Sequence, residues 1–142
     1  VLPSPYRPPE ALRFPAGLEA GQPAAEAAAR DLALHCFRAL GRPCIVDLVY
    51  MELEGRGVFH RVTRNDERHF ARTHAGASGC MHAVLALADG PESARVFTGH
   101  LEGSICFPVR GAEPYGWNRC FVPDGVEQTL AELGESMAWV RP

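Results

Sequence analysis

The chain has 142 residues, of which 46% are hydrophobic and 22% are charged. This length is enough to bury the core of one domain, and this composition is ordinary for a globular protein. The formal net charge of −3 provides no basic surface of the kind that nucleic-acid-binding domains carry. No apolar run approaches the roughly 20 residues that cross a bilayer. We therefore expect one folded domain that binds neither nucleic acid nor membrane.

The cysteines indicate a cellular compartment. The sequence contains five (Cys36, Cys44, Cys80, Cys106 and Cys120), an odd number without close pairs. Small secreted domains instead tend to carry an even set that forms disulfides. This pattern predicts an intracellular protein, cytoplasmic or nuclear. The chain has no recognisable secretory signal and begins with Val1, which indicates a fragment or a processed form.

The first elements follow from proline and glycine positions. Five prolines lie within the first 15 residues and disfavour helix interiors and sheet strands. We expect an extended arm over 1–15 and a single domain over 16–142. Pro23 suits a helix start and Gly41 a helix stop, so the Ala-rich run over 24–40 predicts a helix. Its expected core-facing stripe is Ala25, Ala28, Leu32, Cys36 and Leu40.

The apolar, β-branched run from Pro43 to Met51 predicts a buried strand. Asp47 interrupts this run, and a buried ionised carboxylate is costly unless a cation or a metal pairs with it. Two interpretations of Asp47 remain open from the residues alone. It is either a salt-bridged or strand-end residue, or a ligand for a metal ion.

A glycine-containing loop is expected over 52–59, and Asn65 is suited to cap a helix that extends to Thr73. Several basic side chains lie on or beside this helix. We expect them to form a solvated face, and the alternative is an anion site. These side chains are Arg64, Arg68, His69 and Arg72.

Three strands are predicted next, over 80–88, 94–100 and 103–109. Asp89, Gly90 and Pro91 form a turn after the first, and Gly99 and Gly103 bracket the connection between the other two. His82 lies on the first of these strands. A packed or edge histidine is the simpler interpretation, because no CxxC or HxxxH spacing accompanies it.

The stretch from Tyr115 to Leu133 contains the most specific pattern of the chain. Gly116 permits close approach of the backbone to another group, and Tyr115 and Trp117 flank it with flat rings suited to stacking on another planar ring. Pro123-Asp124-Gly125 has the composition of a turn. A capped helix start and helical spacing at Val126, Leu130 and Leu133 follow this turn.

This stretch resembles the signature of the inosine triphosphate pyrophosphatase family. That signature contains Phe-Gly-Trp-Asp-Pro, Phe-x-Pro-Asp-Gly and Thr-x-Ala-Glu-Leu/Met in this order. Further matches at AVLALA and VFTGHLEGSICFPVRG extend the resemblance from Leu18 to Leu133. It implies an α/β fold with a long mixed, largely antiparallel sheet flanked by helices, and a homodimer. The activity implied is magnesium-dependent cleavage of inosine and xanthosine triphosphates to monophosphate and pyrophosphate.

The resemblance also assigns candidate site residues. Glu19 and Asp47 fall on acids that hold magnesium, which prefers hard oxygen ligands. Asp47 and Asn118 fall on catalytic positions. The nucleotide-binding candidates are Tyr115, Gly116, Trp117 and Arg30. From the residues alone, the favoured interpretation of Arg30 is a solvated residue on the helix face.

The sequence also departs from the family. Asn118 replaces an acid and Arg119 a proline, Arg30 lies at or beside a helix lysine, and the phosphate-binding loop and basic tail are unmatched. Neutralising a triphosphate requires such cations. The main prediction is therefore a catalytically impaired binding or assembly module with residual nucleotide binding, paired with a protein partner or part of a larger chain. The alternative is a magnesium-dependent pyrophosphatase that uses Glu19, Asp47 and Asn118.

Overall fold

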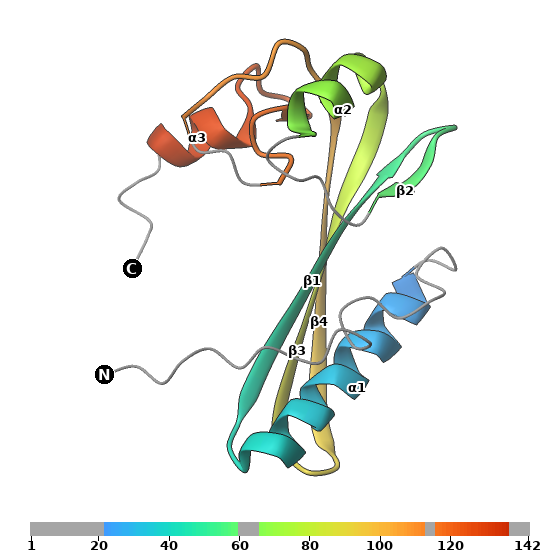
Figure 1. Cartoon of the computed structure of the whole chain (residues 1–142), viewed down its shortest axis with the longest axis vertical. Helices are drawn as coiled ribbons and strands as arrows, with labels where there is room; N and C mark the ends of the chain where they lie inside the picture. Colours follow the sequence, from blue (N-terminus) through green and yellow to red (C-terminus); the bar gives the residue numbers. More distant parts are fainter. Residues whose placement is uncertain (1–21, 60–65, 113–115, 137–142) are drawn as a thin grey trace. The chain divides into compact units, whose positions relative to one another are not determined.

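The computed structural model describes residues 22–59, 66–112 and 116–136. These ranges contain three helices and five strands (Figure 1). The helices are α1 (Gln22–Leu40), α2 (Glu67–His74) and α3 (Leu130–Ser136), and the strands are β1 (Cys44–Leu53), β2 (Gly57–Phe59), β3 (Ser78–Gly90), β4 (Ser93–Ile105) and β5 (Phe121–Pro123). None of these helices is long and apolar enough to cross a membrane. The predicted arm over 1–15 lies outside the described residues.

The strands form one sheet in the order β2-β1-β3-β4-β5. β1 pairs with β2, and β4 pairs with β5, in antiparallel register. β3 and β4 are joined by the two-residue turn at Pro91 and Glu92, which makes this pair a hairpin. The predicted α/β fold, with a long and largely antiparallel sheet flanked by helices, is confirmed.

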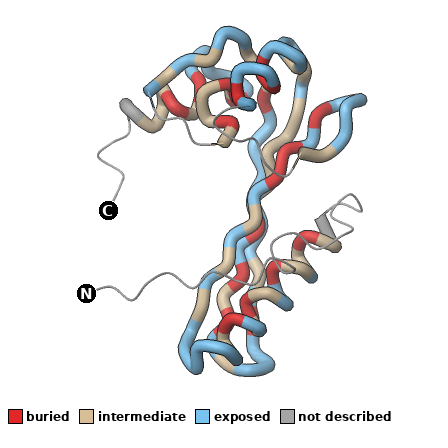
Figure 2. The backbone as a smooth tube through the Cα atoms, viewed as in Figure 1, coloured by how far each residue is buried: buried red, intermediate tan, exposed pale blue. Residues whose placement is uncertain are grey.

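The described residues group into two compact units, and β1, β3 and β4 contribute a segment to each. Unit 1 comprises 22–48 and 83–99, and unit 2 comprises the remaining described residues. In unit 1, α1 lies along the strand segments and buries alanines against them (Figures 1 and 2). Its C-terminus is closed by Gly41, whose N–H donates to the Phe37 carbonyl at 2.7 Å. The predicted helix and its glycine stop are therefore confirmed.

The buried stripe of α1 differs in part from the prediction. Ala25 and Cys36 are buried as expected, but Ala29 and Ala33 are fully buried and Leu40 is 37% exposed. The buried side chains of the strand segments in unit 1 are Val84, Ala86, Ala88 and Ala94. Alanine on both surfaces lets helix and strands approach closely, so small residues mark this interface rather than the larger Leu32 and Leu40.

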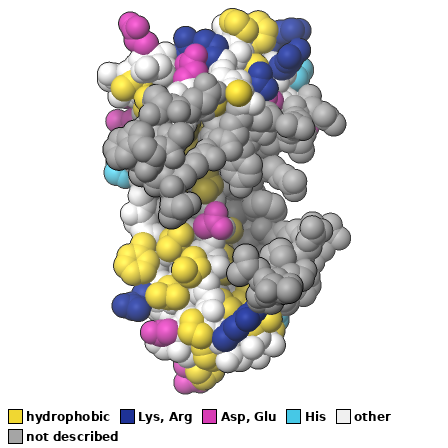
Figure 3. Space-filling model, turned by 90° about the vertical axis from the view of Figure 1, so that its left-hand side faces the viewer, with side chains coloured by type: hydrophobic (Ala, Val, Ile, Leu, Met, Phe, Trp, Pro, Cys, Tyr) yellow, Lys and Arg dark blue, Asp and Glu magenta, His cyan; other side chains and the backbone are white. Residues whose placement is uncertain are grey.

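The prediction that β1 is a buried strand is wrong for its first half. Its side chains alternate between half-buried and exposed from Cys44 to Val49, with Ile45 66% exposed. Asp47 lies on the exposed face, so its carboxylate meets no burial cost. In unit 1, α1 covers one face of the strands (Figure 1), and the apolar side chains of Leu85 and Phe97 are exposed. Figure 3 shows that hydrophobic side chains gather on one face of the molecule.

Three local predictions also need correction. The expected loop over 52–59 contains the end of β1 and the strand β2. The first helix residue of α2 is Glu67, its N-terminus lacks a side-chain cap, and Asn65 lies outside the described residues. The two strands predicted on either side of Gly99 and Gly103 are one continuous strand, β4.

Gly103 is a contact residue rather than a turn residue. A β-carbon there would lie 2.6 Å from the Phe121 ring, whereas one at Gly99 would meet nothing within 4 Å. Phe121 belongs to the core of unit 2, which the buried colours of Figure 2 show. That core comprises Met51, Leu53, Phe70, Ala71, Ile105, Trp117, Cys120 and Phe121. It supports the segment that carries the sequence signature.

Candidate functional site

The first part of the signature, Gly116 to Cys120, folds as a tight turn. Gly116 has φ +54°, a left-handed conformation that glycine adopts without strain. The Trp117 carbonyl accepts hydrogen bonds from the N–H groups of Cys120 at 3.0 Å and Phe121 at 2.9 Å. The Asn118 carbonyl accepts from the Ala131 N–H at 2.8 Å. The backbone of the turn is therefore fixed to β5 and to α3.

The side chains of this turn have different environments. Trp117 is only 5% exposed and packs in the core of unit 2, so its ring anchors the turn from inside. Its Nε1 is buried and has no hydrogen-bond partner among the described residues. Asn118 is partly exposed and presents its amide at the surface. Tyr115, the other expected stacking residue, lies outside the described ranges.

The second part of the signature forms the predicted turn and capped helix. Gly125 has φ +83°, and the Asp124 N–H donates to the Glu102 carbonyl at 2.9 Å. Thr129 and Glu132 form a reciprocal cap, since the Thr129 N–H donates to Glu132 Oε2 at 2.8 Å and the Glu132 N–H donates to Thr129 Oγ1 at 3.3 Å. The turn and cap confirm the sequence pattern, although the helix begins at Leu130, after Val126.

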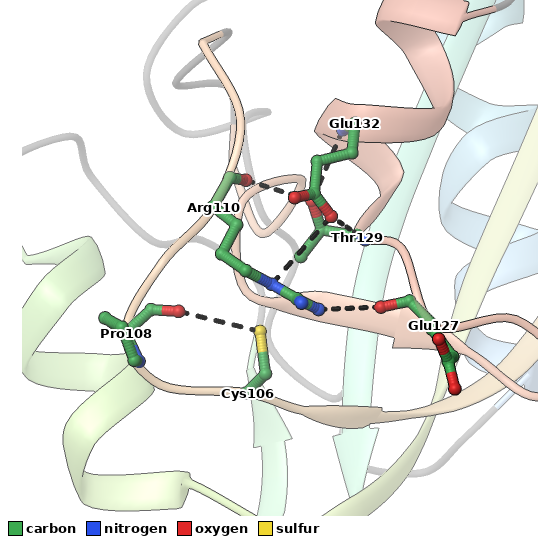
Figure 4. Close-up of polar contacts among 6 residues, drawn as sticks. All are labelled: Cys106, Pro108, Arg110, Glu127, Thr129 and Glu132. Carbon is green, nitrogen blue, oxygen red and sulfur yellow. Dashed lines mark hydrogen bonds and ion pairs between the residues drawn. The ribbon is translucent and has the colours of Figure 1, made fainter.

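Arg110 joins this cap to the loop that follows β4 (Figure 4). Its Nη2 donates to the Glu127 carbonyl at 2.8 Å, and its Nε lies 3.8 Å from Glu132 Oε2. Its own carbonyl accepts from Thr129 Oγ1 at 2.9 Å. An open concavity of about 520 Å³ lies beside this cluster and is lined by Arg110, Gly125, Val126, Glu127, Gln128 and Glu132. It contains none of the site residues that the sequence predicted.

A buried ion pair also supports the turn. Arg119 Nη1 lies 3.4 Å from Glu67 Oε2, and the Glu67 side chain is 4% exposed. Cys120 is buried beside this pair. Burial, followed by the charges of Glu67 and Cys106, raises the pKa of the Cys120 thiol to about 12. The sequence analysis missed this pair, because 52 residues separate its members and no local pattern links them.

Two predicted site residues lie in unit 1. Arg30 projects from α1, and its Nη1 donates to the Ala94 carbonyl at 2.8 Å. Asp47 is exposed on β1 and makes no ion pair within the part of the chain that the structure describes. Gly116, Trp117 and Asn118 lie together in unit 2. Glu19, the other expected metal ligand, lies outside the described residues.

His82 is a packed histidine, as the sequence indicated. Its ring stacks on Tyr50 with centroids 4.7 Å apart, and its Nε2 lies 3.5 Å from Glu52 Oε2. In the described ranges, no three His, Cys, Asp or Glu side chains form a group that could hold a metal. This negative result does not include Glu19.

Two basic residues at α2, Arg56 and Arg72, have protein partners, whereas Arg68 and His69 are exposed. Arg56 Nη1 donates to the Thr73 carbonyl at 2.9 Å and lies 3.1 Å from His74 Nδ1. Arg72 lies over the Phe107 ring at 5.3 Å. Burial and then the charges of Arg56 and His69 lower the pKa of His74. Arg56 thus places a cation at the C-terminal end of α2, where it interacts favourably with the helix dipole.

The sequence and the fold are both similar to known proteins. Residues 19–138 match the model of the Ham1 family. A dITP/XTP pyrophosphatase of Opitutus terrae is 31% identical over 110 residues, which cover 72% of this chain and 50% of that protein. The chain thus spans about half the length of this curated relative.

Two solved structures illustrate the similarity of fold. A HAM1 protein from Coxiella burnetii superposes with a TM-score of 0.63 at 19% identity, covering 79% of this chain and 66% of its own. The Staphylococcus aureus Ham1 protein superposes with a TM-score of 0.61 at 16% identity, covering 78% of this chain and 65% of its own. At these identities the similarity concerns the fold.

Proposed function

The chain belongs to the Ham1 family, and on that premise we propose that the whole protein is a nucleoside triphosphate pyrophosphatase. The proposed reaction cleaves inosine or xanthosine triphosphate to the monophosphate and pyrophosphate. The observation that supports it most strongly is that the signature segment has a fixed conformation. The turn at Trp117 and Asn118 is fixed by backbone hydrogen bonds to β5 and α3, as a preorganised binding element requires.

For the nucleotide base, we assign Tyr115, Gly116 and Trp117. Trp117 is buried, so its assigned part is to anchor the turn, while Gly116 lets the backbone approach the ligand. Asn118 offers an amide that both donates and accepts hydrogen bonds. An amide cannot act as a general base, so its catalytic contribution in this proposal is to orient the substrate.

For the phosphates and the metal ion, we assign Arg30, Asp47 and Glu19. Asp47 fits a magnesium ligand, because its carboxylate is exposed and has no ion-pair partner among the described residues. Glu19 is the second proposed ligand, on the sequence resemblance alone. Magnesium, when bound, would neutralise charge on the phosphate oxygens. Arg30 uses one nitrogen for Ala94 and retains other N–H donors for a phosphate.

A second candidate function is nucleotide binding or assembly without turnover. It is favoured by the residues that replace family acids and cations. Asn118 lacks the charge of the family's carboxylate, and Arg30, which lies at or beside the position of a family lysine, donates one N–H to the Ala94 carbonyl. The loss of one electrostatic contact to a transition state typically costs about 3 to 4 kcal/mol, so several losses together would abolish turnover while leaving binding.

We further propose a homodimer, or a protein partner within a larger assembly, inside the cell. The exposed apolar side chains of unit 1 (Ile45, Leu85 and Phe97) support association, because surfaces of this kind commonly mark interaction sites. An intracellular location, cytoplasmic or nuclear, is supported by the cysteines, which are all free thiols.

Pyrophosphate release tests the proposed reaction. The whole protein, with magnesium, is expected to release pyrophosphate from inosine triphosphate, and Asp47→Asn is expected to abolish this release. Arg95→Gln is a matched control, because Arg95 is 64% exposed and pairs with the exposed Asp89; it should leave the rate unchanged. Turnover that survives Asp47→Asn would contradict the assignment.

Nucleotide binding separates the two candidates. A ligand at 100 times its dissociation constant stabilises a protein by about 2.7 kcal/mol. Stabilisation by inosine triphosphate without pyrophosphate release would favour the second candidate. Absence of both effects would contradict turnover and nucleotide binding alike, and would leave assembly as the proposed role.

A further inference from the structure

Glu67 occupies an unusual position for a carboxylate. It is the first residue of α2, yet it is only 3% exposed, and the other buried residues of this helix are the apolar Phe70 and Ala71. Acidic residues at a helix N-terminus usually interact with the dipole from the solvent side. A buried carboxylate costs several kcal/mol unless a cation pairs with it. The position of Glu67 therefore depends on its partner.

That partner belongs to the signature turn. Arg119 Nη1 lies 3.4 Å from Glu67 Oε2 across 52 residues of chain. The Arg119 carbonyl also accepts a hydrogen bond from the Arg110 N–H at 2.8 Å. Arg119 is thus held at its backbone and at its guanidinium. On the other side of Asn118, Trp117 is held in the same core cluster as Phe70 of α2.

We propose that the Glu67–Arg119 ion pair positions the turn Gly116–Cys120 for nucleotide binding, with Glu67 and Arg119 acting as positioning residues through Trp117 and Asn118. The inference rests on the proposed function of that turn. It adds α2 to the binding element, since α2 supplies Glu67 and its Phe70 belongs to the same core cluster as Trp117. Movement of α2 away from Arg119 would release the side of the turn that Asn118 occupies.

The geometry distinguishes positioning from simple stabilisation. Glu67 Oε1 and Arg119 Nε are buried and have no hydrogen-bond partner among the described residues. The pair therefore makes one long contact instead of a bidentate fork. Buried ion pairs of this quality are often replaced by apolar residues without loss of stability. A pair that two apolar residues could replace without loss of stability, but that fixes the direction of two side chains, is suited to positioning.

The test combines two single variants, each of which removes one charge of the pair, with a replacement of the whole pair by apolar residues. Glu67→Gln and Arg119→Gln should each weaken binding of inosine triphosphate about tenfold, the usual size of coupling between residues in contact. The double variant should lose no more than either single variant, because both remove the same contact. The apolar pair Glu67→Leu with Arg119→Met should retain the midpoint of thermal unfolding but not the affinity. Arg95→Gln, at an exposed ion pair, should retain both.

Three results would overturn the proposal. In the first, the single variants fold and keep their affinity for inosine triphosphate within about twofold of wild type. In the second, the losses of affinity multiply to about hundredfold in the double variant. In the third, the apolar pair restores the affinity. A readout without nucleotide separates this proposal from the proposed function. In a Trp139→Phe background, Trp117 is the remaining tryptophan of the two, and Glu67→Gln should increase quenching of its emission by acrylamide. If the wild-type protein binds no nucleotide, the proposed function fails, and unchanged quenching would also end the positioning role.

Discussion

Gly103 gives the sharpest stability prediction, because its replacement by alanine creates a clash with backbone. The added β-carbon would lie 2.3 Å from the Val122 carbonyl oxygen and 2.6 Å from Phe121 Cζ. Both atoms belong to β5, and Gly103 is paired with Pro123 in the β4–β5 register. Heavy atoms at their optimum are about 3.5–4.0 Å apart. The strand β5 must therefore move by about 1 Å or more, which breaks its pairing or displaces Phe121 from the core.

The size of the effect follows from a comparison within the same strand. Overpacking of this kind costs about 1–3 kcal/mol. At Gly99, a β-carbon meets nothing within 4 Å, and alanine in a strand interior is favoured over glycine by about 0.5–1 kcal/mol. The two variants should thus differ by about 2–4 kcal/mol. For a chain of this length, that difference corresponds to roughly 5–15 °C in the midpoint of thermal unfolding.

The assay is thermal unfolding followed by circular dichroism, with Gly99→Ala as the matched control. Gly103→Ala should melt at a lower temperature than wild type, and Gly99→Ala at the same or a higher temperature. Equal midpoints for the two variants would refute the packing of Gly103 against β5. Loss of stability in Gly99→Ala alone would show that Gly99, and not Gly103, is the contact residue.

Three further predictions concern the cap, His74 and Cys120. Thr129→Ala removes a helix cap and the hydroxyl that donates to the Arg110 carbonyl, so the free energy of unfolding measured in urea should fall by about 2–4 kcal/mol. Thr129→Ser retains the hydroxyl and should lose less. Equal losses in the two variants would contradict the role of the hydroxyl. The folded state lowers the pKa of His74 below its ordinary value of 6.5, so the unfolded state binds more protons as pH falls below about 6.5 and stability decreases there. His74→Phe should reduce this loss between pH 7.5 and 5.5, and an identical pH dependence in both proteins would contradict it. Because its pKa is about 12, Cys120 should react with iodoacetamide at pH 8 far more slowly than Cys106; equal native labelling in peptide mass spectra would contradict its burial.

The sequence predicted the features that depend on local chemistry. Gly41 ends α1 through a hydrogen bond to a residue four positions earlier, and the Pro123–Gly125 turn and the cap at Thr129 involve neighbouring residues. Each of these patterns can be recognised because the residues that make the contact are close in the chain. The resemblance to a known family then supplied the sheet architecture, which no local pattern contains.

The predictions that failed concern features that depend on contacts between residues far apart in the chain. Gly103 was predicted to lie at a turn, but it lies within β4, where the Phe121 ring leaves no room for a β-carbon. The environment of Asp47 depends on which face of β1 is covered by α1. Glu67 has the ordinary appearance of an acidic residue in a first helical turn, and only the fold brings it to Arg119. Sequence periodicity carries no information about such partners.

The most direct test of the account is identification of the products formed from inosine triphosphate and magnesium by the whole protein. Chromatography with mass detection should show inosine monophosphate and pyrophosphate in equal amounts, because the proposed reaction cleaves between the α- and β-phosphates. Inosine diphosphate with inorganic phosphate, or recovery of the triphosphate unchanged, would contradict the proposed pyrophosphatase.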